Sequence, residues 1–220
     1  MPDFEKAQRM SLTTQVEVNL KSALIVGSLK PGIRLITREI AEQLGTSITP
    51  VREALLRLVS SGALQATPAQ AFLVPEISLA RFREVNQIRK NLEGMAAAAA
   101  AAVKMTPGRL NDLRAHMQAF TDAIDEGDMA NALQANCRFH FRLYDYAEMP
   151  TLTAMIEQLW VRIGPCFNYL QTQPCEVLRQ HRICDELFSA LERGDQTQSA
   201  AAICRAIDKD AAVIQRQYLN

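Results

Sequence analysis

Several residues suited to contacting DNA lie around the start of one predicted helix, over 49–61. The candidates at its start are Thr46, Ser47, Thr49 and Arg52, and Arg57 follows further along the same helix. Arg52 is suited to a bidentate contact with guanine in the major groove. Hydroxyls at the positive end of a helix suit phosphate oxygens, although Ser47 and Thr49 have the alternative role of capping the helix. The cluster therefore predicts that the N-terminal end of this helix contacts DNA.

Two further polar pairs have a spacing of four residues, which places each pair on one face of a helix. Arg89 and Glu93 form the first pair, and its plainest interpretation is an intrahelical ion pair worth a few tenths of a kcal/mol. Asn136 and His140 form the second pair, with both heads pointing inward. One interpretation of His140 is a hydrogen-bonded core residue, and a second follows from a family resemblance described below.

The elements that position the first cluster are predicted from periodicity and turn residues. Helices are expected over 14–27, 37–44 and 49–61, and the last carries one apolar stripe formed by Val51, Ala54, Leu55, Leu58 and Val59. Two β-prone pieces, 63–66 and 72–74, flank a turn at Pro68. Three helices and a small hairpin predict a winged helix-turn-helix over 14–75, preceded by a disordered arm over 1–13.

After a linker at 76–77, residues 78–220 are predicted to be entirely helical, so the chain as a whole is mainly α. The six expected helices cover 78–104, 106–127, 128–147, 150–171, 177–193 and 195–218. Short connections predict an antiparallel bundle. Pro165 lies inside one of these helices and is expected to kink it or to open it locally.

Composition limits the possible classes of protein. The 24 Lys and Arg residues balance the 24 Asp and Glu residues. DNA affinity must therefore come from positioned groups or dimerisation rather than from a cationic field. Five cysteines without a C-x-x-C pair indicate reduced thiols. The polar N-terminus and the lack of a long apolar run predict a cytoplasmic protein with no membrane span.

The segment 31–55 resembles the GntR family of bacterial transcriptional regulators. It carries P-G-I-R-L and then I-A-E-Q-L-G-T-S-I-T-P-V-R-E-A-L, against the family pattern P-G-x-x-L and L-A-x-x-L-G-V-S-R-T-P-V-R-E-A-L. The resemblance implies double-stranded DNA as a partner and makes Arg34 a further contact. Ile48 replaces a usual arginine, and the wing lacks its usual basic residue, which leaves Gln70 as its candidate contact. We expect an altered operator sequence.

The helices after residue 78 resemble the FCD effector-binding domain of FadR-type regulators. Supporting features are R-x-x-x-E at 89–93, N-C-R-F-H at 136–140 and A-L-E-R-G-D at 190–195. The resemblance implies that Arg89, beside Glu93, lines a central pocket and holds a ligand carboxylate.

Many such domains hold a divalent metal, and the resemblance places its first two ligands at Asn136 and His140. The remaining two histidine positions fall on Cys184 and Ala206, while His181 lies one turn before Cys184. The sequence therefore leaves open whether Asn136 and His140 bind a zinc-like ion. The effector-site candidates are Arg89, Glu93, Asn136, His140, His181 and Cys184.

These features predict a ligand-responsive repressor that acts as a homodimer on a palindromic operator. We expect a small organic acid as effector. Alternatives are an acyl-CoA-type sensor without metal and a metal-dependent enzyme built on the helical half. The sequence lacks a nucleophile elbow, a glycine-rich phosphate loop and H-E-x-x-H, which argues against an enzyme.

Overall fold

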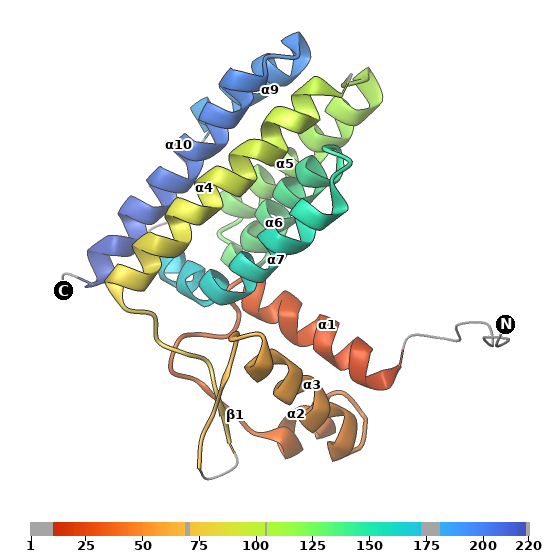
Figure 1. The fold of residues 1–220 in the computed structure, drawn as a ribbon, viewed down its shortest axis with the longest axis vertical. Helices are drawn as coiled ribbons and strands as arrows, with labels where there is room; N and C mark the ends of the chain where they lie inside the picture. The colour runs from red at the N-terminus through yellow and green to blue at the C-terminus, as the bar shows by residue number, and fades with distance from the viewer. Residues whose placement is uncertain (1–10, 69–70, 104, 173–180, 219–220) are drawn as a thin grey trace, which may run out of the picture.

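The computed structural model describes residues 11–68, 71–103, 105–172 and 181–218, although the side chains of 171–172, 181–183 and 217 lie outside this description. The chain forms a small reading head (residues 12–74) beneath a larger helical bundle (residues 79–218) (Figure 1). The mainly α architecture and the order of its two parts confirm the fold class that the sequence predicts. Among the described helices, none is both long and apolar enough to cross a membrane.

The reading head contains three helices and a small antiparallel sheet of strand order β1-β3-β2. Its elements are α1 (Leu12–Ile25), β1 (Arg34–Leu35), α2 (Thr37–Gln43), α3 (Ile48–Ser60), β2 (Gln65–Ala66) and β3 (Phe72–Leu73). In register, Leu73 faces Arg34 on one side and Gln65 on the other. The sequence predicted the β2–β3 hairpin but missed β1, because two residues are too few to show strand periodicity.

The first helix begins earlier than expected. Ser11 caps α1 by accepting a hydrogen bond from the backbone N–H of Thr14, so residues 12 and 13 are helical and not part of a disordered arm. Residues 1–10 lie outside the described part of the chain. Thr13 donates a hydrogen bond to Glu53 at 2.9 Å and thereby ties the start of α1 to α3.

The apolar stripe of α3 forms the core of the reading head, as predicted. Val51, Ala54, Leu55 and Leu58 are fully buried, and Leu24 of α1 is buried with them. The two helices pack directly against each other. Burial of this stripe fixes the rotation of α3 about its own axis, so the opposite face is directed to solvent.

The bundle is built from long helices joined by short turns. Its elements are α4 (Leu79–Ala102), α5 (Pro107–Asp125), α6 (Met129–Asp145), α7 (Pro150–Ile163), η1 (Gly164–Thr172), α9 (His181–Arg193), α10 (Gln196–Gln215) and η3 (Arg216–Tyr218). Helices α4 and α10 run side by side along its length (Figure 1). As predicted, Pro165 interrupts the helix: α7 ends at Ile163 and the chain continues as a 3₁₀ turn.

The reading head meets the bundle where α1 ends against the α7–η1 junction. A Cβ atom at Gly164 would overlap the carbonyl oxygen of Leu24, and one at Gly27 would lie 2.8 Å from the backbone nitrogen of Asn168. Asn168 also donates a hydrogen bond to the carbonyl of Gly27 at 3.1 Å. The two parts are therefore in backbone contact here, an approach that only glycine permits.

Candidate DNA-reading surface and effector site

The start of α3 presents the predicted hydroxyl groups to solvent. Ser47 occupies the N-cap position with an extended backbone, and its side chain makes no capping hydrogen bond. Thr49 is exposed in the first turn. The structure therefore does not support capping as the role of the Ser47 hydroxyl, and this group is available for a DNA phosphate.

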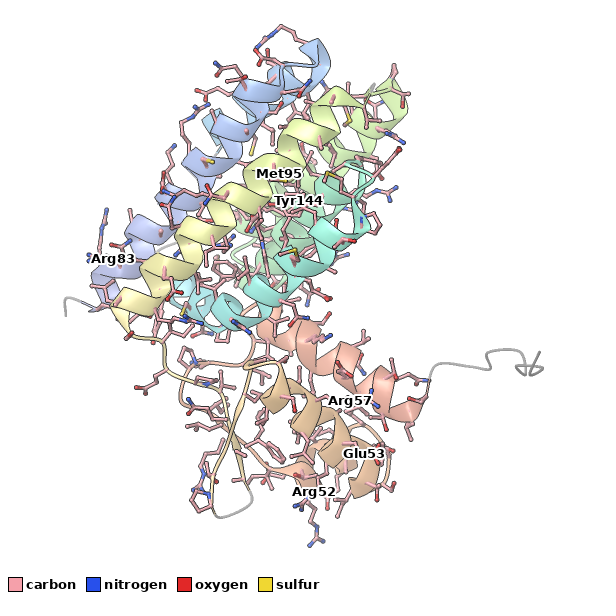
Figure 2. All side chains as sticks on the ribbon, in the orientation of Figure 1. Arg52, Glu53, Arg57, Arg83, Met95 and Tyr144 are labelled. Atoms are coloured by element: carbon pink, nitrogen blue, oxygen red, sulfur yellow. The ribbon has the colours of Figure 1, made fainter. Side chains whose placement is uncertain are left out.

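Arg52 lies one turn further along α3 and extends away from the reading head, at the end farthest from the bundle (Figure 2). Its neighbours are fixed by α1: Glu53 accepts a hydrogen bond from Thr13, and Arg57 pairs with Glu17 at 3.2 Å. Arg57 is exposed, but this ion pair already connects it to α1. Arg52 thus extends from the far end of the head, and Arg57 is held against α1 by its ion pair with Glu17.

The remaining sequence-predicted DNA contacts are less uniform. Arg34 is exposed on β1. Thr46 is half-buried, and its hydroxyl oxygen has no hydrogen-bond partner within the described residues. Gln70 lies outside the described residues. Ile48, which replaces the usual arginine, is 51% exposed at the first position of α3.

In the bundle, the Arg89–Glu93 pair is buried rather than lying on a solvated helix face. The two side chains are only 4% and 0% exposed, and Arg89 Nε lies 2.6 Å from Glu93 Oε1. Arg89 also donates to Asn86 at 3.1 Å. Spacing alone suggested an ordinary surface ion pair. The pair that forms is instead a buried one, because both charges are removed from water.

Two aromatic residues that sequence reasoning missed complete this buried network. The Tyr144 hydroxyl donates to Glu93 Oε2 at 2.6 Å, and Trp160 Nε1 donates to Glu93 Oε1 at 2.9 Å. The Arg89 guanidinium lies 4.9 Å from the centre of the Trp160 ring. Glu93 thus occupies the place that the FCD resemblance gives to a ligand carboxylate. Two signals were available: Tyr144 lies four residues after His140, and Trp160 is the only tryptophan of the sequence.

The predicted metal positions do come together, but around a very small cavity. Asn136, His140, Cys184 and Ala206 line a space of about 20 Å³ together with apolar side chains of α5, α6, α9 and α10. This is room for roughly one water molecule. His181 begins α9, but its side chain is outside the described part of the structure.

The donor set at this cavity does not fit the zinc-like ion that the resemblance left open. Burial raises the pKa of the Cys184 thiol to about 12, and its sulfur lies 3.6 Å from that of Met117. Burial lowers the pKa of His140 to about 4, which keeps the imidazole in the neutral form that metals bind, and its Nδ1 pairs with the Tyr144 hydroxyl at 3.0 Å. His140 is therefore a competent ligand, and it is the other donors that do not fit. Ala206 offers no donor. Zinc sites use three or four protein ligands, and no group of three or more His, Cys, Asp or Glu residues is close enough to hold a metal within the described residues.

Comparison with protein families accounts for both parts of the chain. Residues 12–74 match the bacterial regulatory proteins of the gntR family, and residues 84–209 match the FCD domain. The chain therefore belongs to the GntR family of bacterial transcriptional regulators, in the group that carries an FCD ligand-binding domain. The alternative of an enzyme built on the helical half is not supported.

Individual relatives agree with this assignment. The chain is 43% identical over 220 residues to the HTH-type transcriptional regulator McbR of Escherichia coli K12, covering 99% of each protein. It is 28% identical over 170 residues to the HTH-type transcriptional repressor RspR of the same organism, covering 76% of this chain and 73% of that one. A solved structure of E. coli McbR/YncC superposes with a TM-score of 0.91 over 96% of this chain and 100% of that chain. A putative GntR regulator from Rhodococcus sp. RHA1, at 20% identity, shares the fold with a TM-score of 0.73 over 94% and 98% of the two chains.

Proposed function

We propose that this regulator is a repressor that binds a palindromic operator as a homodimer and is released by a small organic acid. The observation that carries the DNA-reading role is the placement of Arg52. It extends from the far end of the head, one turn after the solvent-facing hydroxyls of Ser47 and Thr49 (Figure 2). Hydroxyls that bind phosphate and a guanidinium that reads guanine are the two kinds of contact that a recognition helix makes.

The test is operator binding by wild type and Arg52→Ala, measured by fluorescence anisotropy over a salt series. The DNA is the region that flanks the protein's own gene. Loss of one bidentate base contact is expected to weaken binding about 10- to 100-fold, equivalent to roughly 1–3 kcal/mol. Arg205→Ala is the matched control, since Arg205 is an exposed arginine on α10, paired with Glu186. Equal binding by wild type and Arg52→Ala at every salt concentration would reject the assignment.

Ile48 gives this head an exposed apolar side chain where the GntR family pattern has an arginine. An exposed aliphatic side chain at the start of a recognition helix suits the C5-methyl group of thymine. Replacing the thymines of the operator one at a time by uracil removes only that methyl group. One such position is expected to weaken binding by wild type and to have no effect on Ile48→Ala. If uracil is neutral at every position, Ile48 does not contact a thymine methyl.

The homodimer is supported by an apolar strip on two adjacent helices of the bundle. Ile88 and Met95 of α4 and Met155 of α7 are exposed, with Met95 and Met155 each at 52%, and half-buried Leu92 lies between the two α4 residues. Met95 is located near the middle of the visible face of the bundle (Figure 2). A second copy that covers this strip removes apolar surface from water and pairs two reading heads.

Analytical ultracentrifugation of Met95→Lys tests this interface. We expect a dimer for wild type and a monomer for the variant, because a buried unpaired lysine opposes association. Val18→Lys is the control, because Val18 is a comparably exposed apolar residue on α1 of the reading head. If Met95→Lys remains a dimer, a different face of the chain forms the interface.

A further inference from the structure

Arg162, half-buried near the end of α7, differs from the buried Arg89 in its partners. It donates one hydrogen bond, from Nη2 to the backbone carbonyl of Ser61 at 2.8 Å. Its Nε is buried and has no hydrogen-bond partner, and no carboxylate pairs with it in the described part of the chain. A partly buried guanidinium without a counter-ion is energetically costly. This position therefore favours an incoming anion.

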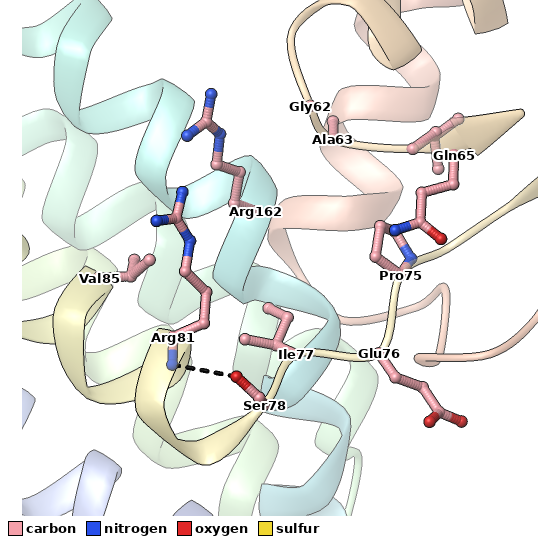
Figure 3. A pocket seen from close by; sticks show the side chains of 11 residues that line it. Gly62, Ala63, Gln65, Pro75, Glu76, Ile77, Ser78, Arg81, Val85 and Arg162 are labelled. Atoms are coloured by element: carbon pink, nitrogen blue, oxygen red, sulfur yellow. Dashed lines mark hydrogen bonds between the residues drawn. The ribbon is translucent and has the colours of Figure 1, made fainter.

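A cleft of about 520 Å³ opens beside this guanidinium, between the reading head and the bundle (Figure 3). One wall is the turn after α3, from Gly62 to Gln65, and the other is formed by the start of α4 with Arg162. The inter-domain segment 75–78 closes one side. A volume of this size lies in the range of small-molecule sites.

The charge of the cleft favours anions. The N-terminus of α4 lines it through Ser78 and Arg81, and a helix N-terminus carries partial positive charge. Arg81 pairs with Glu84 through Nη1 alone. Glu76 is the only carboxylate in the cleft lining that the structure describes. Its side chain points away from both guanidinium groups (Figure 3), and its Oε1 lies close to Gly32 of the reading head.

The hydrogen bond from Arg162 connects the cleft to the reading helix. Ser61 is the C-cap residue of α3, so a cation of the bundle stabilises the carbonyl end of the helix whose other end carries Arg52. A guanidinium has five N–H donors, and Ser61 takes one of them, so a carboxylate or phosphate that bound Arg162 would share this cation with the Ser61 carbonyl. Binding in the cleft would thus change how firmly α3 is held against the bundle.

We propose that this cleft is a binding site for a small organic anion bearing a carboxylate or phosphate group, with Arg162 as its principal partner and Arg81 as a second cation. The inference rests on the proposed function in one respect: occupancy of the cleft alters operator affinity because it alters the attachment of α3. By linkage, DNA and the anion change each other's affinity by the same factor.

Isothermal titration without DNA tests the site itself. The probes are citrate for the carboxylate class and glycerol 3-phosphate for the phosphate class. We expect at least one probe to bind wild type and to bind Arg162→Gln at least tenfold more weakly. Its affinity for Arg162→Lys should be intermediate, because lysine keeps the charge but lacks the planar fork of the guanidinium. Arg205→Gln is the matched control and is expected to bind like wild type. Thermal unfolding shows whether each variant is folded, and Arg81→Gln replaces Arg162→Gln if the latter is not.

Operator binding with and without the bound probe forms a separate arm. A probe that binds wild type and lowers its operator affinity supports coupling between the cleft and the DNA-binding surface. A probe that binds but leaves operator affinity unchanged rejects the regulatory role of the cleft and leaves only the binding site. The anion site is overturned if neither probe binds wild type or if both bind Arg162→Gln as tightly as wild type. Failure of wild type to bind DNA, with anion binding intact, would contradict the proposed function but not the cleft site.

Discussion

Two arginines of this regulator are withdrawn from water in different ways. Arg89 lies deep in the bundle with Glu93 bound to it, and it is not among the residues that line the cavity of about 20 Å³. Arg162 lies at the domain junction without a carboxylate among the described residues, beside a cleft of about 520 Å³. The first arginine is neutralised by the chain itself, whereas the second retains the capacity to bind an external anion.

This difference shows why an arginine in an effector domain is not by itself a ligand site. A ligand carboxylate that approached Arg89 would have to displace Glu93, which also accepts hydrogen bonds from Tyr144 and Trp160. At Arg162 an anion displaces at most one backbone carbonyl. The following experiments test that contrast, beginning with the largest expected effect.

Removal of the resident carboxylate should be severe. Glu93→Ala leaves Arg89 buried and uncompensated, so we expect a loss of about 3–5 kcal/mol in the free energy of unfolding. Glu84→Ala on the same helix removes an exposed partner of Arg81 and should cost less than about 1 kcal/mol. Urea denaturation measures both. Similar losses for the two variants would show that burial does not distinguish these pairs.

The backbone contact between α1 and the α7–η1 junction should be less costly to disturb. Gly164→Ala forces a methyl group against the Leu24 carbonyl, and we expect a loss of roughly 1–3 kcal/mol from overpacking. Gly108→Ala is the control, because its Cβ would meet only the Thr106 hydroxyl at 3.8 Å. Thermal unfolding distinguishes them. If Gly164→Ala is as stable as wild type, the head and bundle are not rigidly joined at α1.

The ionisation of Asp210 tests whether Arg89 can stabilise a second carboxylate besides Glu93. Burial raises the pKa of Asp210 to about 7, and the charge of Arg89, which lowers the pKa and is in turn opposed by Glu93, does not cancel that effect. The folded state therefore retains a proton that the unfolded state loses near pH 4. Between about pH 4 and pH 7 wild type should lose stability relative to Asp210→Asn, with a slope of up to about 1.4 kcal/mol per pH unit, and the difference should level off above pH 7. Urea denaturation of both proteins across this range measures it. A constant difference would show that Asp210 ionises normally.

Metal removal should have the smallest effect. Because the donors around the closed cavity do not fit a metal, dialysis against EDTA is expected to change the thermal midpoint by less than about 1 °C, as a ligand that does not bind the native state does not stabilise it. Differential scanning calorimetry with and without added zinc chloride measures this, and elemental analysis accompanies it. A stoichiometric metal whose removal lowers the midpoint by several degrees would restore the metal site.

The local pattern of the chain was sufficient to predict most elements. The helix starts near residues 78 and 106, where the structure has N-caps, the break at Pro165 and the apolar stripe of α3 follow from interactions within a few residues. The short strand β1 was missed because its pairing with β3 is a long-range interaction. The state of Arg89 was also misjudged on spacing alone, since four-residue spacing does not indicate whether a pair faces water or the core.

The sequence by itself determined the reading helix, because the T-P-V-R-E-A-L motif is contiguous and all of its residues lie within one helix, α3. Only the tertiary structure decided the fate of the charged groups. Glu93, Tyr144 and Trp160 come from three helices, and Arg162 reaches Ser61 across 101 positions of sequence. Whether an arginine is neutralised or left to bind an anion depends on which side chains surround it in space, and separation along the chain carries no information about that.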